Sequence, residues 1–175
     1  MRAAAAVLAA CAAAAPSAAQ SYPVSERGAV SQHVAFTTFT VTYGRPSARG
    51  RTLFGDLVPW DEVWHPGADS ASRLVIDHDI QMEGQPVAAG EYSLWLIPRA
   101  HAPWTLILSH AAHAFHKPYP GASKDAYRIE VPADSLSFVE TLEIGFPMVA
   151  RDEAVLRIHW GATAVSVRIK APYQP

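Results

Sequence analysis

Alternating apolar and polar positions dominate the chain, and this period of two predicts β-strands. In HVAFTTFTVTYG, residues 33–44, apolar side chains occupy every second position up to Phe36 and again from Phe39 onward. A one-residue slip at Thr37-Thr38 separates the two runs. Such a slip is typical of a β-bulge, so a bulged strand is expected here.

Later segments continue the pattern. ASRLVIDHDIQM, residues 71–82, alternates throughout, and the pattern places His78 on the apolar side with Leu74 and Ile76. Further strands are expected in EYSLWLIP, AYRIEV, LSFVETLEIGF and the nearly all-apolar PWTLILS, which suits a strand buried on both faces. Gly161 separates AVLRIHW from ATAVSVRIK and is predicted to form the turn of a hairpin.

These segments give about eight or nine strands, and no window keeps an apolar period of 3.6. We therefore predict an all-β fold, an antiparallel β-sandwich or a jelly-roll-like arrangement. Two long irregular loops interrupt the strands, at residues 44–71 and 110–124, and long ordered loops are usually functional. A site is expected where loops meet at one end of the sandwich. The expected core residues are Phe39, Val41, Leu94, Leu96, Leu106, Leu108, Ile144 and Ile158.

The first residues have the pattern of a secretory signal peptide. Arg2 supplies a positive charge, residues 3–15 are apolar, and Ser17-Ala18-Ala19 offers a cleavage site. The apolar run is shorter than the roughly 20 residues that a membrane-spanning helix needs. An exported protein, periplasmic or extracellular, is therefore expected.

The domain boundaries follow from this interpretation: a signal peptide over 1–19, an N-terminal lead-in over 20–32, and a single β-sandwich domain over 33–175. A buried N-terminal helix is one alternative, and a lipid anchor on Cys11 is another. Cys11 is the only cysteine, so a chain cleaved after residue 19 forms no disulfide. Export without disulfides fits a bacterial periplasm.

Charge and hydropathy exclude two classes of partner from the prediction. Lys and Arg number 14 and Asp and Glu 16, for a formal net charge of −2. No basic run is long enough to suggest nucleic-acid binding, and no second apolar segment is long enough to predict a membrane span.

Several segments together resemble a known family. They are YGRPSARGRTLFGDLVPW from residue 43, GADSAS from 67, VAAGEYSLWLIP from 87 and WTLIL from 104. In combination they are similar to the domain of unknown function family 2911, over roughly residues 34–169. The resemblance implies an all-β domain and secretion, and it supplies no reaction. Where members carry Arg-Thr-Gly-Ala-Asn, residues 65–69 read His-Pro-Gly-Ala-Asp, so a role of that arginine or asparagine does not transfer.

Three arginines in the first long loop are candidate ligand-binding residues: Arg45, Arg49 and Arg51. Guanidinium groups bind carboxylates, phosphates or sugar hydroxyls through paired N–H donors. The alternative is structural, with the arginines bonding the loop's own carbonyls and carboxylates.

Trp60 and Trp64 lie in the same loop and could stack on a sugar ring or plug the end of the sandwich. Trp95 and Trp104 fall in strands and are expected in the core. His65 and Asp69 complete the predicted ligand-binding set.

Histidines suggest a metal site. His110, His113 and His116 are spaced by three, and three imidazoles would suit zinc or copper. His65 and Asp69 could join them if the two long loops meet. A metal is the alternative, and the main prediction is that no cofactor is bound.

The usual catalytic signatures are missing: the sequence has no Gly-x-Ser-x-Gly elbow, phosphate-binding loop or dinucleotide fingerprint. The leading hypothesis is a binding module for a small polar or anionic ligand, a glycan or a carboxylate. The second is a metal-assisted hydrolase or lyase that uses loop His and Asp residues. The third is a structural envelope protein without a small ligand, and the fold alone does not choose among them.

Overall fold

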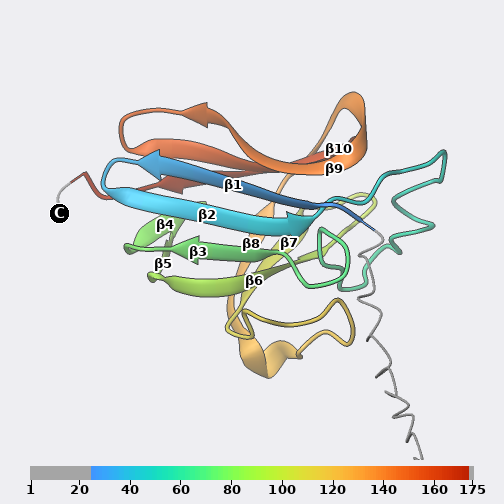
Figure 1. The fold of residues 1–175 in the computed structure, drawn as a ribbon, viewed down its shortest axis with the longest axis horizontal. Coiled ribbons are helices and arrows are strands. Elements are labelled where there is room, and N and C mark those ends of the chain that lie inside the picture. The colour runs from blue at the N-terminus through green and yellow to red at the C-terminus, as the bar shows by residue number, and fades with distance from the viewer. Residues whose placement is uncertain (1–24, 174–175) are drawn as a thin grey trace, which may run out of the picture.

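The computed structural model describes residues 25–173, which form two antiparallel sheets (Figure 1). The larger sheet has the strand order β1-β2-β3-β6-β7-β8 and the smaller the order β5-β4-β10-β9. The strands are β1 (Arg27–Val34), β2 (Thr37–Gly44), β3 (Arg73–Ile76), β4 (Ile80–Met82), β5 (Gln85–Val87), β6 (Gly90–Ile97), β7 (Trp104–Ser109), β8 (Asp125–Val131), β9 (Ala133–Val149) and β10 (Glu153–Lys170). A 3₁₀ turn, η1 (Ala122–Lys124), precedes β8.

The core lies between the two sheets and is built from alternate positions of their strands. Tyr92, Leu94 and Leu96 of β6 face it, as do Leu106 and Leu108 of β7. The eight core positions predicted from the sequence are confirmed, since none is more than 4% exposed. Antiparallel pairing throughout confirms the all-β fold class.

The predicted bulge at Thr37-Thr38 is wrong, because the chain reverses there. Val34 pairs with Thr37, and the two residues between them form a tight turn in which Ala35 has a φ of 51°. Tight hairpins need such a positive φ, which is usually supplied by Gly or Asn. Alanine gives no turn signal, so the two strands resembled one interrupted strand.

Strand β1 begins at Arg27, so part of the expected lead-in over 20–32 belongs to the larger sheet. The signal segment expected over 1–19 lies outside the described residues. No helix within 25–173 is long and apolar enough to cross a membrane.

The segment 71–82 is two strands instead of one. β3 ends in the larger sheet, and β4 starts in the smaller sheet after three intervening residues. The bend between them exposes His78, whose Nδ1 lies 2.8 Å from the carboxylate of Asp77. The placement of His78 on the apolar side is therefore wrong, because the alternation restarts where the chain changes sheet.

The predicted hairpin at Gly161 is also wrong. β10 continues through this glycine as one strand of 18 residues paired with β9. The register shifts on both sides of Gly161, whose φ is 60°. A glycine in this conformation accommodates a bulge that bends a strand without reversing it. The reversal lies before β10, where Ala150 donates its N–H to the carbonyl of Glu153 at 2.7 Å.

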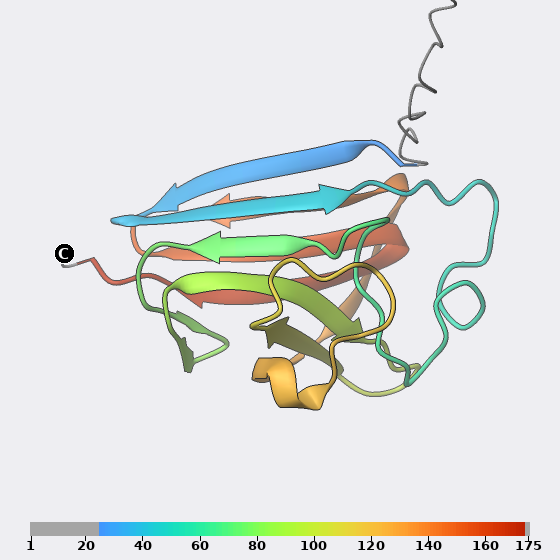
Figure 2. The ribbon, with the colours of Figure 1, turned by 60° about the horizontal axis from the view of Figure 1, so that its bottom comes forward.

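The first long loop is held against the end of the sandwich. Leu53 and Val58 are buried in the main core, whereas Leu57 is 42% exposed. Trp64 and Leu96 exchange two backbone hydrogen bonds, of 2.8 and 2.7 Å, which attach the loop to β6. The outward face of β6 and β7 carries a small second cluster, made by Trp95, Ile97 and Ile107 together with Ala71. Figure 2 looks onto this face, with the second loop in yellow in front of it.

Candidate functional site

The two long loops meet on the outer face of the larger sheet. Ala71 donates its N–H to the carbonyl of Ala114 at 3.0 Å, and His116 donates to the carbonyl of Asp69 at 2.9 Å. Between these bonds, Ser70 and Phe115 form an isolated antiparallel bridge. The pairing fixes the end of the first loop against the middle of the second, so side chains from both loops share one site.

A pocket of about 830 Å³ lies between the loops and the sheet. Its aromatic walls are Trp64, Trp95, Tyr119 and Trp160. Trp64 stacks on Trp160 with centroids 6.1 Å apart and planes 11° from parallel. The edge-on contact of Trp95 and Tyr119 has centroids 5.2 Å apart. The pocket therefore has rigid ring surfaces and a volume that suits a small molecule.

Charged residues also line the pocket: Arg51, Glu62 and Lys117. Arg51 comes from the first loop, and its guanidinium donates to the carbonyls of Ser47 at 2.7 Å and Ala48 at 2.9 Å. These bonds brace the loop and use only part of the guanidinium's five N–H donors. Arg51 thus combines the structural role with a position in the pocket.

Two imidazoles line the same pocket. The rings of His65 and His116 lie 6.0 Å apart, and the His65 ring also contacts Trp95 edge-on at 5.7 Å. Their Nδ1 atoms are buried and have no hydrogen-bond partner within residues 25–173. Burial lowers the pKa of His65 to about 4, and the nearby His116 acts in the same direction. His65 is therefore neutral at pH 7 and can offer an unprotonated ring nitrogen.

Gly67 allows this close packing. A Cβ at this position would lie 2.7 Å from the hydroxyl oxygen of Ser72 and 3.3 Å from Nδ1 of His65. The Ser72 hydroxyl donates to the carbonyl of Pro66 at 2.6 Å. A side chain at Gly67 would therefore displace either this bond or the imidazole.

Asp69 is not among the residues that line the pocket, but its Oδ2 is also buried and makes no hydrogen bond to a described residue. The residue has a φ of 61°, and its carbonyl accepts the bond from His116. Among residues 25–173 no group of three His, Cys, Asp or Glu side chains is arranged to hold a metal ion.

The other predicted loop residues lie apart from this pocket. Arg45 donates to the carbonyl of Leu142 at 3.4 Å and lines a different hollow. Arg49 is exposed, and its backbone N–H donates to the carboxylate of Glu140 at 2.6 Å. Trp60 is 37% exposed and packs on Phe54 with ring centroids 6.2 Å apart.

The burial expected of Trp95 and Trp104 is confirmed. Trp104 packs edge-on against Phe54 in the main core, whereas Trp95 is buried in the second cluster on the outer face of the sheet.

The three spaced histidines point to different neighbours. His110 packs on Tyr92 with centroids 5.7 Å apart, and the exposed His113 lies 3.5 Å from the carboxylate of Glu91. Of the three, His116 lines the pocket, where its neighbour is His65. The structure therefore does not bring the expected trio together.

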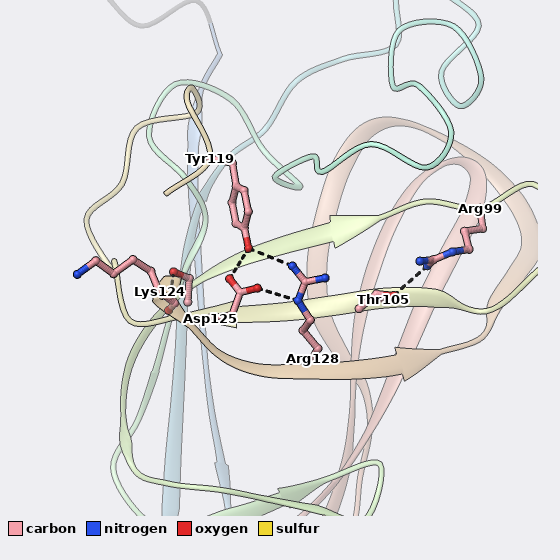
Figure 3. A network of polar contacts seen from close by, with 7 residues as sticks. Arg99, Thr105, Tyr119, Lys124, Asp125 and Arg128 are labelled. Carbon is pink, nitrogen blue, oxygen red and sulfur yellow. Dashed lines mark hydrogen bonds and ion pairs between the residues drawn. The ribbon is translucent and has the colours of Figure 1, made fainter. Parts of the chain in front are cut away.

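A polar network that the sequence did not indicate anchors the second loop (Figure 3). The Tyr119 hydroxyl donates to the carboxylate of Asp125, and Arg128 donates through Nε to the same carboxylate at 2.8 Å. Burial and the bond to Asp125 raise the pKa of Tyr119 to about 12. The network fixes a pocket wall. No local pattern around Tyr119 could have revealed it, because its partners come from β8.

Comparison with protein families gives one finding. The family model described as "Protein of unknown function (DUF2911)" matches residues 25–169, nearly all of the described chain. Comparisons with curated proteins and with solved structures gave no significant match.

Proposed function

The chain belongs to the DUF2911 family, and we propose that it is a binding module for a small polar ligand, a glycan residue that carries a carboxylate. The ligand would occupy the pocket between the two long loops. The support comes from the chemistry of the lining, which offers aromatic faces, hydrogen-bonding nitrogens and cations within one hollow.

The observation that carries the proposal is the pair of buried imidazole nitrogens of His65 and His116 without partners. A buried polar atom left unpaired costs about 1–3 kcal/mol, and a ligand group that pairs with it recovers this cost less the loss of its own hydration. A sugar hydroxyl can donate or accept a hydrogen bond, so it suits either tautomer of each ring. The partly exposed ring of Trp64, supported by its stacking on the buried Trp160, would contact the apolar side of the sugar ring.

The anionic part of the proposal rests on Arg51 and Lys117. Both line the pocket, and Lys117 is exposed and makes no ion pair with a described residue. Glu62 opposes them with one negative charge, so cations outnumber anions at the lining. A charge-assisted bond to a carboxylate is about twice as strong as a neutral one, which favours a sugar acid over a neutral sugar.

The proposal is tested by thermal shift and calorimetric titration with galacturonate, glucuronate and glucose. We expect a saturable rise in melting temperature with a uronate, since a ligand at a hundred times its Kd adds about 2.7 kcal/mol of stability. Lys117→Met should weaken uronate binding, and Lys124→Met, an exposed lysine outside the pocket, is the matched control. Absence of binding by every sugar, or equal effects of the two variants, would contradict the proposal.

A second candidate function is metal-assisted hydrolysis or elimination, favoured by the 6.0 Å separation of the His65 and His116 rings. Zinc or copper bound by this pair would take its remaining ligands from water and substrate. Metal analysis of protein purified without a histidine tag tests this candidate. Stoichiometric metal that is lost in His65→Ala would support it, and metal-free protein whose melting temperature does not respond to zinc would reject it.

We also propose that the protein acts outside the cytoplasm. The support is the apolar segment over residues 3–15, followed by the small residues Ser17-Ala18-Ala19. A protein that is retained in the cytoplasm, with residues 1–19 uncleaved, would contradict this location.

A further inference from the structure

We propose that a second hollow, lined by Arg45, Arg157 and His159, binds a small oxyanion. It has a volume of about 410 Å³ and shares no lining residue with the pocket between the loops. It lies where the end of β2 and the start of the first long loop run beside β9. There Leu142 donates its N–H to the carbonyl of Pro46 at 2.9 Å, and the side chains of Ser47 and Thr141 are 3.1 Å apart.

Two guanidinium groups give the hollow its positive charge. Arg45 donates through Nε to the carbonyl of Leu142 at 3.4 Å, and Arg157 donates through Nε to the hydroxyl of Ser166 at 3.2 Å. Within residues 25–173 neither arginine forms an ion pair, and their terminal N–H groups make no hydrogen bond. Carboxylates and phosphates are the groups that such donors bind best.

His159 supplies an independent indication of a ligand. The residue is 6% exposed, and its Nε2 is buried without a partner among the described residues. Its other nitrogen, Nδ1, lies 3.5 Å from the carboxylate of Glu143. Glu143 is the one carboxylate of the lining and lies beside Nδ1 alone, so Nε2 has no partner among the described residues.

One wall of the hollow, at Tyr43 and Ile144, is held by hydrogen bonds, and the space beside Gly145 is empty. The Tyr43 hydroxyl donates to the carbonyl of Ile144 at 3.3 Å and accepts the Ile144 N–H at 3.0 Å, which fixes β9 at this point. A Cβ at the neighbouring Gly145 would meet no atom within 4 Å. The free space, the two guanidinium groups and the unpaired imidazole nitrogen together fit the oxygen atoms of a phosphate or of a short carboxylate.

The test is a titration of the ¹⁵N-labelled protein with inorganic phosphate and, separately, with succinate, followed by NMR at constant ionic strength. We expect saturable shifts at Gly145 and His159 with one or both anions, and the stronger binder identifies the oxyanion class. Arg157→Gln should weaken binding at least tenfold, about 1.4 kcal/mol. Arg49→Gln, which removes an exposed arginine outside both hollows, should leave it unchanged.

Gly145→Ala provides a second variant that does not remove a charge. It adds a single methyl group to the empty space beside residue 145, so it should weaken phosphate or succinate binding while the fold is retained. The proposal would be overturned if sodium chloride produced the same chemical-shift changes. It would also be overturned if Arg157→Gln and Arg49→Gln weakened anion binding equally. Because these residues lie outside the first pocket, a failure here is distinguishable from a failure of sugar-acid binding.

Discussion

The His65 and His116 rings, which belong to different loops, lie 6.0 Å apart, and each keeps a buried Nδ1 without a described partner. The backbone bond from His116 to Asp69 fixes this pairing. The two residues therefore lie together only because the two loops meet.

The first prediction concerns the pH dependence of stability. The pKa of His65 is lowered by burial from 6.5 to about 4, so the unfolded chain binds a proton more readily than the folded chain. The contribution of neutral His65 to the free energy of unfolding is fully present above pH 6.5. It is lost as the pH falls from 6.5 to about 4, and the loss amounts to a few kcal/mol. Urea denaturation at several pH values should show this slope, and His65→Gln should reduce it. An unchanged slope in the variant would contradict a buried neutral His65.

A second prediction concerns the packing beside His65. Gly67→Ala places a methyl group against the hydroxyl of Ser72 and the imidazole of His65, so it should cost about 1–3 kcal/mol of unfolding free energy. Gly145→Ala, where a Cβ meets open space, is the control and should change stability by less than about 0.5 kcal/mol. Chemical denaturation of both variants gives the comparison. Equal effects would mean that the backbone around Gly67 relaxes freely.

The third prediction concerns the core. Leu94→Ala removes a fully buried side chain of β6 and should cost about 2–5 kcal/mol. Leu136→Ala truncates a leucine of β9 that is 37% exposed, and its cost should be much smaller. Equilibrium unfolding of the two variants measures the difference. A loss below about 0.5 kcal/mol for Leu94→Ala would place the residue outside the core.

The sequence predicted the strand period and the core because burial on one face leaves a direct trace in alternation, as at Leu94 and Leu96. It failed where the chain turns without a turn residue, at Ala35, and where a glycine bends a strand without reversing it, at Gly161. In both cases pairing with other strands decides the conformation, and a single segment does not encode that pairing.

For the candidate site, too, the sequence indicated individual residues but not the contacts between distant segments. The sequence indicated Arg51, Trp64 and His65 from local composition, and all three line the pocket. It raised a meeting of His65 with the histidines of the second loop but could not single out His116, nor could it separate Arg45 from Arg51, because these relations arise from the contacts between distant segments.

The fourth prediction concerns maturation. The small residues that end at Ala19 predict a mature N-terminus at Gln20 when the protein is expressed with its own leader. Intact-mass and N-terminal peptide spectrometry of the exported protein would measure it. Detection of a lipid-modified Cys11 would replace this prediction with membrane anchoring.

The last prediction concerns the anchor of the second loop. Tyr119→Phe removes the hydroxyl that donates to Asp125 and leaves the ring against Trp95. Arg128 still pairs with the Asp125 carboxylate, so the global cost should be only about 0.5–1.5 kcal/mol. The local effect should be larger, because the hydroxyl ties the loop to β8, and amide hydrogen exchange should accelerate over residues 111–121 but not in β6 or β7. Thr105→Val, which removes the hydroxyl bonded to Arg99 on the same sheet face, is the control and should leave exchange in the loop unchanged. If both variants leave that exchange unaltered, backbone bonds such as those to residues 69–71 are enough to hold the loop, and Tyr119 serves the pocket only as an aromatic wall.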